Sequence, residues 1–450
     1  MVKTAVSILL ALSSLAAAAL EVGVYRWDAP TGPGRVDAYE LWLGSPVMLA
    51  EAFEARETWE AIGGAAWQLG PWSQWVRART GRNLVLGVPL LPGPANRSGP
   101  DQIAGNADDV SLDKCAAGQY DETWRTLANQ LAYYGLSWAY LRLGWEMDGD
   151  WYAWGAPQGS GREASYAGCF RRVVQTMRAA QPGNQWKFVW NPTATWTDPA
   201  WLNAVWPGDA YVDVVGIDLY DQSWASGTYP YPSSCDSACR LARQQTAWNG
   251  YAWYLQTIRS FAAAHSKPMA IPEWGLYTRS DGHGGGDNPY YIQKMRQFIA
   301  DPANGVLFHA YFDVKAPDGD HHISGLDAVS AFPQSASTFK QLFGAALPAS
   351  TPTTPPADQT PPSVYLSRPS AGTVIKRRST VTMEASASDN VKVTRVEFLV
   401  NGRQVCRATS SPYRCTASVG AASDSKYVLK VRAFDAAGHS AEYSRTYRAG

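Results

Sequence analysis

The chain has 450 residues, with 39 Lys and Arg balanced by 39 Asp and Glu, and 46% of its residues are hydrophobic. This length exceeds one ordinary domain, although an α/β barrel can use about 250 or more residues as a single unit. We therefore expect two domains. The zero net charge, and the lack of any recognisable nucleic-acid-binding motif, argue against a nucleic-acid partner.

The N-terminus is typical of a secretory signal peptide. Lys3 precedes an apolar run that ends in small residues at 16–19. The apolar run is too short to span a bilayer, and no later segment is long or apolar enough to do so. We expect residues 1–19 to be a signal peptide and the mature protein to be secreted, extracellular or periplasmic, without a membrane partner.

Six cysteines fit an oxidising compartment, where an even number is typical of disulfides. Sequence proximity suggests the pairs Cys235 with Cys239 and Cys406 with Cys415, which leaves Cys115 with Cys169. A zinc site is the alternative, but no Cys-x-x-Cys pair occurs and no histidine lies near Cys235. We favour three disulfides and expect neither metal nor cofactor.

Residues 20–346 contain eight apolar segments that alternate with helical patterns. The segments are LEVGVYRW, PVMLAEAF, NLVLGVPLL, WAYLRLGW, WKFVWNP, VDVVGIDLY, PMAIPEWG and VLFHAYFDV. This alternation predicts a (β/α)8 TIM barrel, an α/β fold in which the loops after the strands form the active face.

The chain changes character at residues 347–362, LPASTPTTPPADQTPP, a Pro/Thr run typical of an extended linker. Residues 363–450 then alternate apolar and polar side chains, with a hairpin turn at Asn401–Gly402, and predict a small all-β sandwich. The segment SDNVKVTRVEFLVNG resembles the bacterial immunoglobulin-like modules of secreted polysaccharide-degrading enzymes. This part carries 14 Lys and Arg against 6 Asp and Glu, so it is basic and the rest is acidic.

Two carboxylates stand at the ends of predicted barrel strands. Glu146 follows the fourth and Glu273 ends the seventh, a separation that fits three βα units of about 42 residues each. Both can therefore point into one site. Retaining glycosidases use such a pair about 5 to 5.5 Å apart, one as nucleophile and one as acid/base. Three tryptophans beside Glu146 would stack on sugar rings: Trp145, Trp151 and Trp154.

At these positions the sequence resembles glycoside hydrolases of clan A, most closely family 26. EMDGDWYAW resembles the acid/base motif, PEWG the nucleophile motif, and VDVVGIDLY the strand whose tyrosine contacts the nucleophile. The resemblance implies that Glu146 is the acid/base and Glu273 the nucleophile, with Asp218, Tyr220 and Trp274 beside them. It also implies endo-hydrolysis of a β-linked polysaccharide, often β-mannan.

The chain departs from the family pattern in two places. Trp145 stands where the family usually has a histidine before the acid/base, and NLVLGVPLLPG lacks the histidine of strand three. Both histidines help define the sugar pocket, so β-mannan is the first expectation and β-1,3-xylan or β-glucan the next. A non-catalytic polysaccharide- or cell-wall-binding protein, or a transglycosylase, is the alternative. We expect a monomer.

Several side chains have two interpretations. Arg142 either holds a carboxylate, within the substrate-binding set, or is structural. We expect His321 to lie in a solvated loop. The remaining tryptophans divide between core and sugar-binding positions in a way that the sequence does not resolve; they include Trp72, Trp75, Trp190, Trp196 and Trp224.

Overall fold

The structure is a computed structural model that describes residues 22–344, 361–370, 372–389, 392–421 and 425–450. The predicted signal peptide, 1–19, and nearly all of the predicted linker lie outside these residues. Within the described residues, no helix combines the length and the apolar character that crossing a membrane requires.

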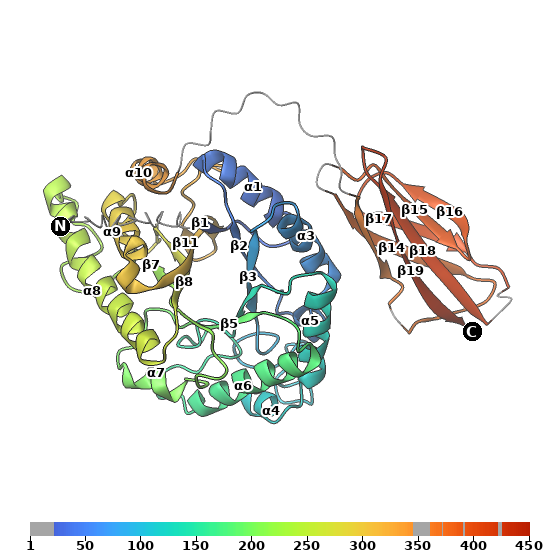
Figure 1. The fold of residues 1–450 in the computed structure, drawn as a ribbon, viewed down its shortest axis with the longest axis horizontal. Coiled ribbons are helices and arrows are strands. Elements are labelled where there is room, and N and C mark those ends of the chain that lie inside the picture. Colours follow the sequence, from blue (N-terminus) through green and yellow to red (C-terminus); the bar gives the residue numbers. More distant parts are fainter. Residues whose placement is uncertain (1–21, 345–360, 371, 390–391, 422–424) are drawn as a thin grey trace, which may run out of the picture.

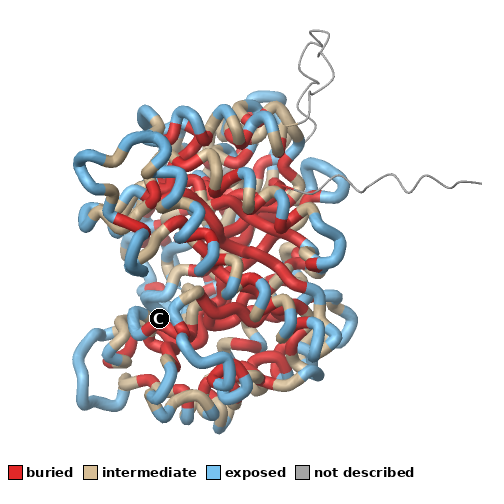
Figure 2. The backbone as a smooth tube through the Cα atoms, turned by 90° about the vertical axis from the view of Figure 1, so that its left-hand side faces the viewer, coloured by how far each residue is buried: buried red, intermediate tan, exposed pale blue. Residues whose placement is uncertain are grey.

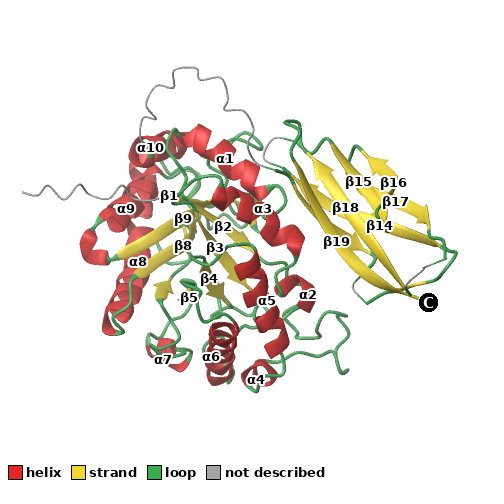
Figure 3. Cartoon of the chain, turned by 45° about the vertical axis from the view of Figure 1, so that its right-hand side comes forward, coloured by secondary structure: helices red, strands yellow, loops and turns green. Residues whose placement is uncertain are grey.

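The larger part is a closed parallel barrel, and all eight predicted segments form its strands (Figure 3). The strands from β1 to β6 pair in sequence order, β8 pairs with β9, and β1 pairs with β9. The sixth position is divided between two short strands, β6 and β7, which both pair with β8. The strands are β1 (Val22–Tyr25), β2 (Leu49–Phe53), β3 (Asn83–Val88), β4 (Tyr140–Leu143), β5 (Lys187–Trp190), β6 (Val214–Gly216), β7 (Leu219–Tyr220), β8 (Met269–Gly275) and β9 (Val306–Phe312).

Helices surround this barrel (Figure 1). They are α1 (Gly32–Leu43), α2 (Trp59–Ile62), α3 (Ala66–Arg77), α4 (Leu112–Ala116), α5 (Asp121–Tyr133), α6 (Glu163–Ala180), α7 (Ala200–Ala204), α8 (Ser237–Ala264), α9 (Pro289–Ala300), the 3₁₀ helix η1 (Pro302–Asn304) and α10 (Pro333–Phe343). A short hairpin, β10 (Lys315–Ala316) with β11 (Gly319–Asp320), follows the last barrel strand.

The α6 helix shows why these segments fold as they do. Its buried side chains include Tyr166, Phe170, Val173 and Met177, a spacing that places them on one face. Each such side chain contributes roughly 1.5–3 kcal/mol when it leaves water. Figure 2 shows the same division in the whole chain, with buried residues (red) in the interior strands and exposed residues (pale blue) in outer loops.

The three predicted disulfides are present in the predicted pairs. Cys115–Cys169 links α4 to α6, with its Cα atoms 5.0 Å apart. Cys235–Cys239 lies at the start of α8, and Cys406–Cys415 joins two strands of the C-terminal part.

The C-terminal part is a sandwich of two mainly antiparallel sheets, ordered β12-β14-β17 and β13-β19-β18-β15-β16. Side chains such as Met383, Phe398 and Val431 fill its core. The strands are β12 (Ser363–Arg368), β13 (Val374–Ile375), β14 (Thr380–Ser388), β15 (Arg395–Val400), β16 (Arg403–Ala408), β17 (Tyr413–Ser418), β18 (Lys426–Phe434) and β19 (Ser440–Ala449).

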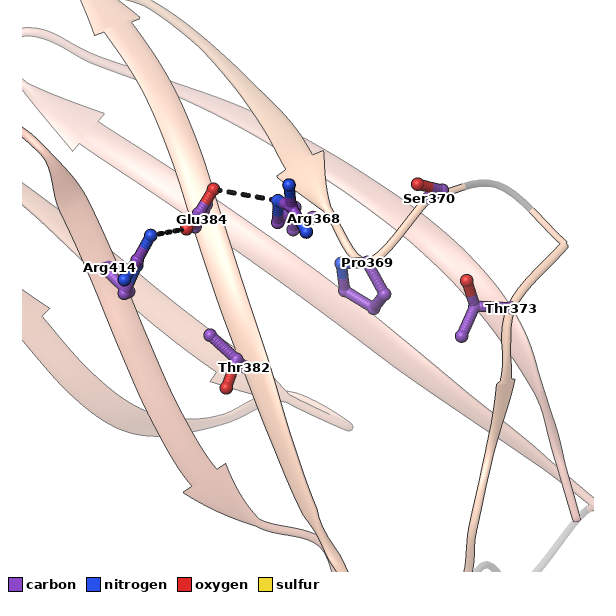
Figure 4. A pocket seen from close by; sticks show the side chains of 7 residues that line it. All are labelled: Arg368, Pro369, Ser370, Thr373, Thr382, Glu384 and Arg414. Atoms are coloured by element: carbon purple, nitrogen blue, oxygen red, sulfur yellow. Dashed lines mark ion pairs between the residues drawn. The ribbon is translucent and has the colours of Figure 1, made fainter.

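A hollow of about 510 Å³ lies on the sandwich, where Arg368 and Arg414 both pair with Glu384 (Figure 4). Pro369, Ser370, Thr373 and Thr382 complete its lining. This lining has no aromatic ring. The hollow therefore does not offer the flat apolar surface on which sugars stack.

Candidate active site

The loop after β4 holds Glu146 in an unusual backbone conformation. Gly144 and Glu146 have φ angles of 52° and 55°. A Cβ on Gly144 would lie 2.5 Å from a methyl carbon of Leu90, so a larger residue does not fit there. For Glu146 the left-handed conformation costs of order 1–2 kcal/mol. Strain of this kind persists where the surrounding structure imposes it, as it often does at functional sites.

Hydrogen bonds from the neighbouring loop hold this conformation. The backbone N–H of Glu146 donates to the carbonyl of Asn191 over 2.9 Å. Asp148 accepts from the backbone N–H and the hydroxyl of Thr193 and from the hydroxyl of Thr195, each over 2.7 Å. The loops after β4 and β5 are thus joined. No role was predicted for Asp148 from the sequence, although its position two residues after Glu146 suggests that it supports the loop that carries Glu146.

Glu273 lies within β8 and receives two strong donors. The hydroxyl of Tyr220 donates to its Oε2 over 2.6 Å, and Arg142 Nη2 donates to its Oε1 over 2.9 Å. Its own backbone N–H donates to Asp218 over 3.1 Å. Burial, followed by the charge of Glu273, raises the pKa of Tyr220 well above its usual range, so this hydroxyl remains a donor. The contact that the family resemblance implied between Tyr220 and Glu273 is present.

Arg142 binds the carboxylates at the centre of the barrel. It pairs with Glu51, with Asp218 over 2.7 Å and with Glu273 over 2.9 Å, and its Nε donates to Asn191 over 2.9 Å. This confirms the first of its two interpretations. The exposed fraction of Arg142 is 0% and that of Asp218 is 2%, so both side chains are buried beside Glu273 and support it. Glu51, on β2, was missed by sequence reasoning.

Glu146 and Glu273 come together as predicted, with Asp218. One carboxylate oxygen of each lies within 4.8 Å of the others. At that separation two negative charges repel by about 3 kcal/mol at an effective dielectric constant near 20. Burial, then the charges of Glu273 and Asp218, raise the pKa of Glu146 well above its usual range. Such carboxylates could also surround a cation, but Arg142 already neutralises two of them.

The tryptophans beside Glu146 have different positions. Trp151 is 45% exposed, and its indole N–H donates to Glu146 Oε2 over 3.0 Å. Trp145 is 4% exposed and packs against Phe53, with ring centroids 5.0 Å apart. Trp154 is completely buried and donates to the Trp145 carbonyl over 2.8 Å. Trp151 can therefore contact a ligand as predicted, whereas the prediction for Trp154 is wrong because its ring lies inside the core.

Trp274 also differs from the prediction. Although it follows Glu273 directly, its ring is completely buried, and its N–H donates to His309 over 3.0 Å. Consecutive strand residues point to opposite sides, so Trp274 packs against the outer helices, including Phe339 of α10. The structure thus places this ring in the core between the barrel and its outer helices.

His321 is buried, in contrast to the expected solvated loop. Its Nδ1 lies 2.8 Å from the Leu276 carbonyl, and its ring lies 4.6 Å from that of Tyr220. Burial lowers the pKa of His321 to about 4, so the ring is neutral near pH 7. The chain folds back through the β10–β11 hairpin, where the His321 N–H donates to the Val314 carbonyl, and this places the ring against the site.

Two regions match known families. Residues 125–260 match glycosyl hydrolase family 26, and residues 362–431 match a bacterial Ig domain.

Three curated relatives match parts of the chain. An endoglucanase H of Acetivibrio thermocellus is 24% identical over 51% of this chain and 22% of its own length. A mannan endo-1,4-beta-mannosidase of Bifidobacterium adolescentis is 28% identical over 39% and 18%. A beta-1,3-xylanase of an Alcaligenes species is 30% identical over 45% and 34%. The chain thus spans about a fifth to a third of the length of these relatives. The family matches therefore show a likeness to glycosyl hydrolase family 26 in part of the barrel and to bacterial Ig domains in the C-terminal sandwich.

Proposed function

We propose that this chain is a secreted, retaining endo-β-glycanase that works by double displacement. The observation that carries the proposal is the pair Glu146 and Glu273, whose nearest oxygens lie within 4.8 Å at the carboxyl ends of barrel strands. A pair this close leaves no room for a water molecule beside the anomeric carbon, so one carboxylate must attack directly.

In the first step, Glu273 attacks the anomeric carbon while Glu146 gives its proton to the departing glycosidic oxygen. A glycosyl ester on Glu273 and a shortened chain result. In the second step, Glu146 takes a proton from water, whose oxygen displaces Glu273 and restores both groups. Two inversions leave the configuration of the sugar unchanged.

The surroundings of each carboxylate suit these roles. Arg142 and Tyr220 donate to both oxygens of Glu273, which stabilises its negative charge before attack and after departure. Burial and the charges of Glu273 and Asp218 raise the pKa of Glu146, which favours the protonated form that a general acid needs. Trp151 donates to Glu146 and orients it.

We propose β-mannan as the first substrate, followed by β-1,3-xylan and β-glucan. The three curated relatives act, by their names, on different polysaccharides, so they support β-linked chains as a class. Trp145 bears on the choice, because a buried indole in place of a histidine removes a polar group from the pocket.

A substrate panel tests the proposal. The purified chain should release oligosaccharides from at least one of β-mannan, galactomannan, β-1,3-xylan and mixed-linkage glucan, as judged by reducing ends and product length. Proton NMR of the fresh product should show the β-anomer first. An initial α-anomer would exclude double displacement, and release of monosaccharides alone would exclude endo-action. Binding without any cleavage would favour a non-catalytic polysaccharide-binding protein.

A further inference from the structure

The structure separates the five tryptophans that the sequence did not resolve. Four are buried, with exposures of 3% or less: Trp72, Trp75, Trp190 and Trp196. Trp224 is 58% exposed. Leaving so large an apolar ring in water forgoes roughly 1.5–3 kcal/mol of burial. It lies in the loop after β7, on the side of the barrel where Glu146 and Glu273 lie.

A neighbouring loop supports the Trp224 ring. The loops after β7 and β8 are joined by an antiparallel bridge between Gln222 and Gly284, and the N–H of Ser223 donates to the His283 carbonyl over 2.9 Å. Across this junction the His283 ring stacks on Trp224, with centroids 5.2 Å apart and planes 20° from parallel.

Arg279 also contacts the ring, with its guanidinium carbon 4.9 Å from the ring centroid of Trp224. Arg279 is itself fixed, because it donates to Gln222 over 3.0 Å and pairs with Asp281 over 2.8 Å. A ring held in this way loses little side-chain freedom when a ligand binds, so more of the contact energy remains as affinity.

The supported ring is linked to the nucleophile by direct contacts. The Arg279 guanidinium also lies 4.9 Å from the ring of Tyr277, whose centroid is 5.9 Å from that of Tyr220. Tyr220 donates to Glu273. Trp224 is therefore connected to Glu273 through the side chains of Arg279, Tyr277 and Tyr220.

We propose that Trp224 is a carbohydrate-stacking platform that binds a pyranose unit of the β-linked chain beyond the unit held at Glu273. This inference rests on the proposed function. The exposed indole offers an apolar face to the C–H side of a sugar ring, and Arg279 and His283 keep it in place. Such a platform makes catalysis depend on substrate length, because only a chain long enough to reach Trp224 gains the contact.

The test compares Trp224→Ala and Trp224→Phe with the unsubstituted chain. Substrates are an aryl β-disaccharide and the oligosaccharide series, from two to six units, of the glycan that the panel identifies. Trp224→Ala should lower kcat/KM about three- to tenfold once the oligosaccharide reaches the platform, the range for one aromatic stacking contact. The aryl substrate should change less than twofold, and Trp224→Phe should recover most of the loss.

Trp138→Ala is the matched control. Trp138 is 66% exposed but precedes β4, at the opposite end of the barrel from Glu146, so this variant should behave like the unsubstituted chain at every length. Arg279→Ala should reproduce part of the length-dependent loss, and should add little in the Trp224→Ala background if Arg279 acts through the indole.

A Glu273→Gln background separates this inference from the proposed function. Titration calorimetry with mannohexaose, cellohexaose and β-1,3-xylohexaose reads binding without cleavage, and Trp224→Ala should weaken the best ligand about three- to tenfold. Equal losses at every substrate length, or unchanged hexaose affinity, would overturn the platform even if the chain is an active glycanase. A hexaose that binds through Trp224 but is not cleaved by the unsubstituted chain would keep the platform and overturn the hydrolase.

Discussion

The surroundings of Glu146 and Glu273 differ although the two side chains are identical and lie within 4.8 Å. Glu273 sits in a regular strand and accepts from Arg142 and Tyr220. Glu146 sits in a loop with left-handed backbone and accepts from the indole of Trp151. Cationic and hydroxyl donors stabilise a carboxylate, whereas burial beside negative charge keeps a carboxyl protonated. The two environments thus favour the roles that we propose, Glu273 as nucleophile and Glu146 as acid.

Removing Glu273 should have the largest effect. Glu273→Ala deletes the attacking oxygen, and turnover on polysaccharide should fall by about four orders of magnitude or more. Added azide should then yield a glycosyl azide of inverted configuration. Asp150→Ala, which removes an exposed carboxylate of the β4 loop, is the control and should change little. Substantial residual turnover of the natural substrate in Glu273→Ala would assign the nucleophile elsewhere.

Removing Glu146 should cost less and should depend on the leaving group. Glu146→Ala should slow polysaccharide cleavage by about 10²- to 10⁴-fold, the usual range for a general acid. Aryl glycosides with good leaving groups need little protonation, so glycosyl-enzyme formation from them should be nearly unaffected. Azide should accelerate turnover and give a product of retained configuration. An equal loss on both kinds of substrate would contradict the assignment.

The pH profile of kcat/KM tests whether burial and neighbouring charges raise the pKa of Glu146. Because the pKa of Glu146 is raised, kcat/KM should remain high above the usual range of a carboxyl group and fall as the pH rises through the raised pKa. Asp218→Asn removes one of the charges that raise it, so the alkaline limb should move to lower pH. An unmoved limb in a folded variant would mean that another group controls it. Circular dichroism checks folding.

Removing the sandwich should have the smallest effect. The partners of both glutamates lie between Glu51 and Glu273, so truncation after Ser350 should leave kcat/KM on soluble polysaccharide within about twofold, worth roughly 0.4 kcal/mol. We propose that residues 20–346 fold and act without residues 363–450. If truncation lowers the affinity for acidic or insoluble material, the affinity of the full chain for that material should weaken as salt is added. A folded but inactive truncated chain would contradict this division.

Much of the fold could be predicted because it depends on local patterns. Apolar runs mark the eight strands, and the spacing of βα units brings Glu146 and Glu273 to one end of the barrel. The contacts that support them could not be predicted in this way. Arg142 binds partners 91, 76 and 131 residues away, and no local pattern identifies Glu51 as one of them.

Side-chain direction and loop folding explain the errors. Trp154 and Trp274 lie next to exposed or catalytic residues in sequence, but their rings point into the core, and composition alone does not show this. His321 was expected in solvent because it lies in a predicted loop, yet a short hairpin turns it inward. No local pattern indicated that Trp224 would be exposed, because its position depends on contacts with His283 and Arg279 of another loop.

Because the backbone at Glu146 is left-handed, a substitution at this position that raises thermal stability should lower turnover. Glycine adopts a φ of 55° without penalty and asparagine tolerates it, so Glu146→Gly and Glu146→Asn should each relieve about 1 kcal/mol of backbone strain and remove a poorly solvated carboxyl. Their melting temperatures should exceed that of the unsubstituted chain while their polysaccharide turnover falls. A library selected only for survival at high temperature would therefore discard the proposed acid/base, and selection for stability in this barrel has to hold residue 146 fixed.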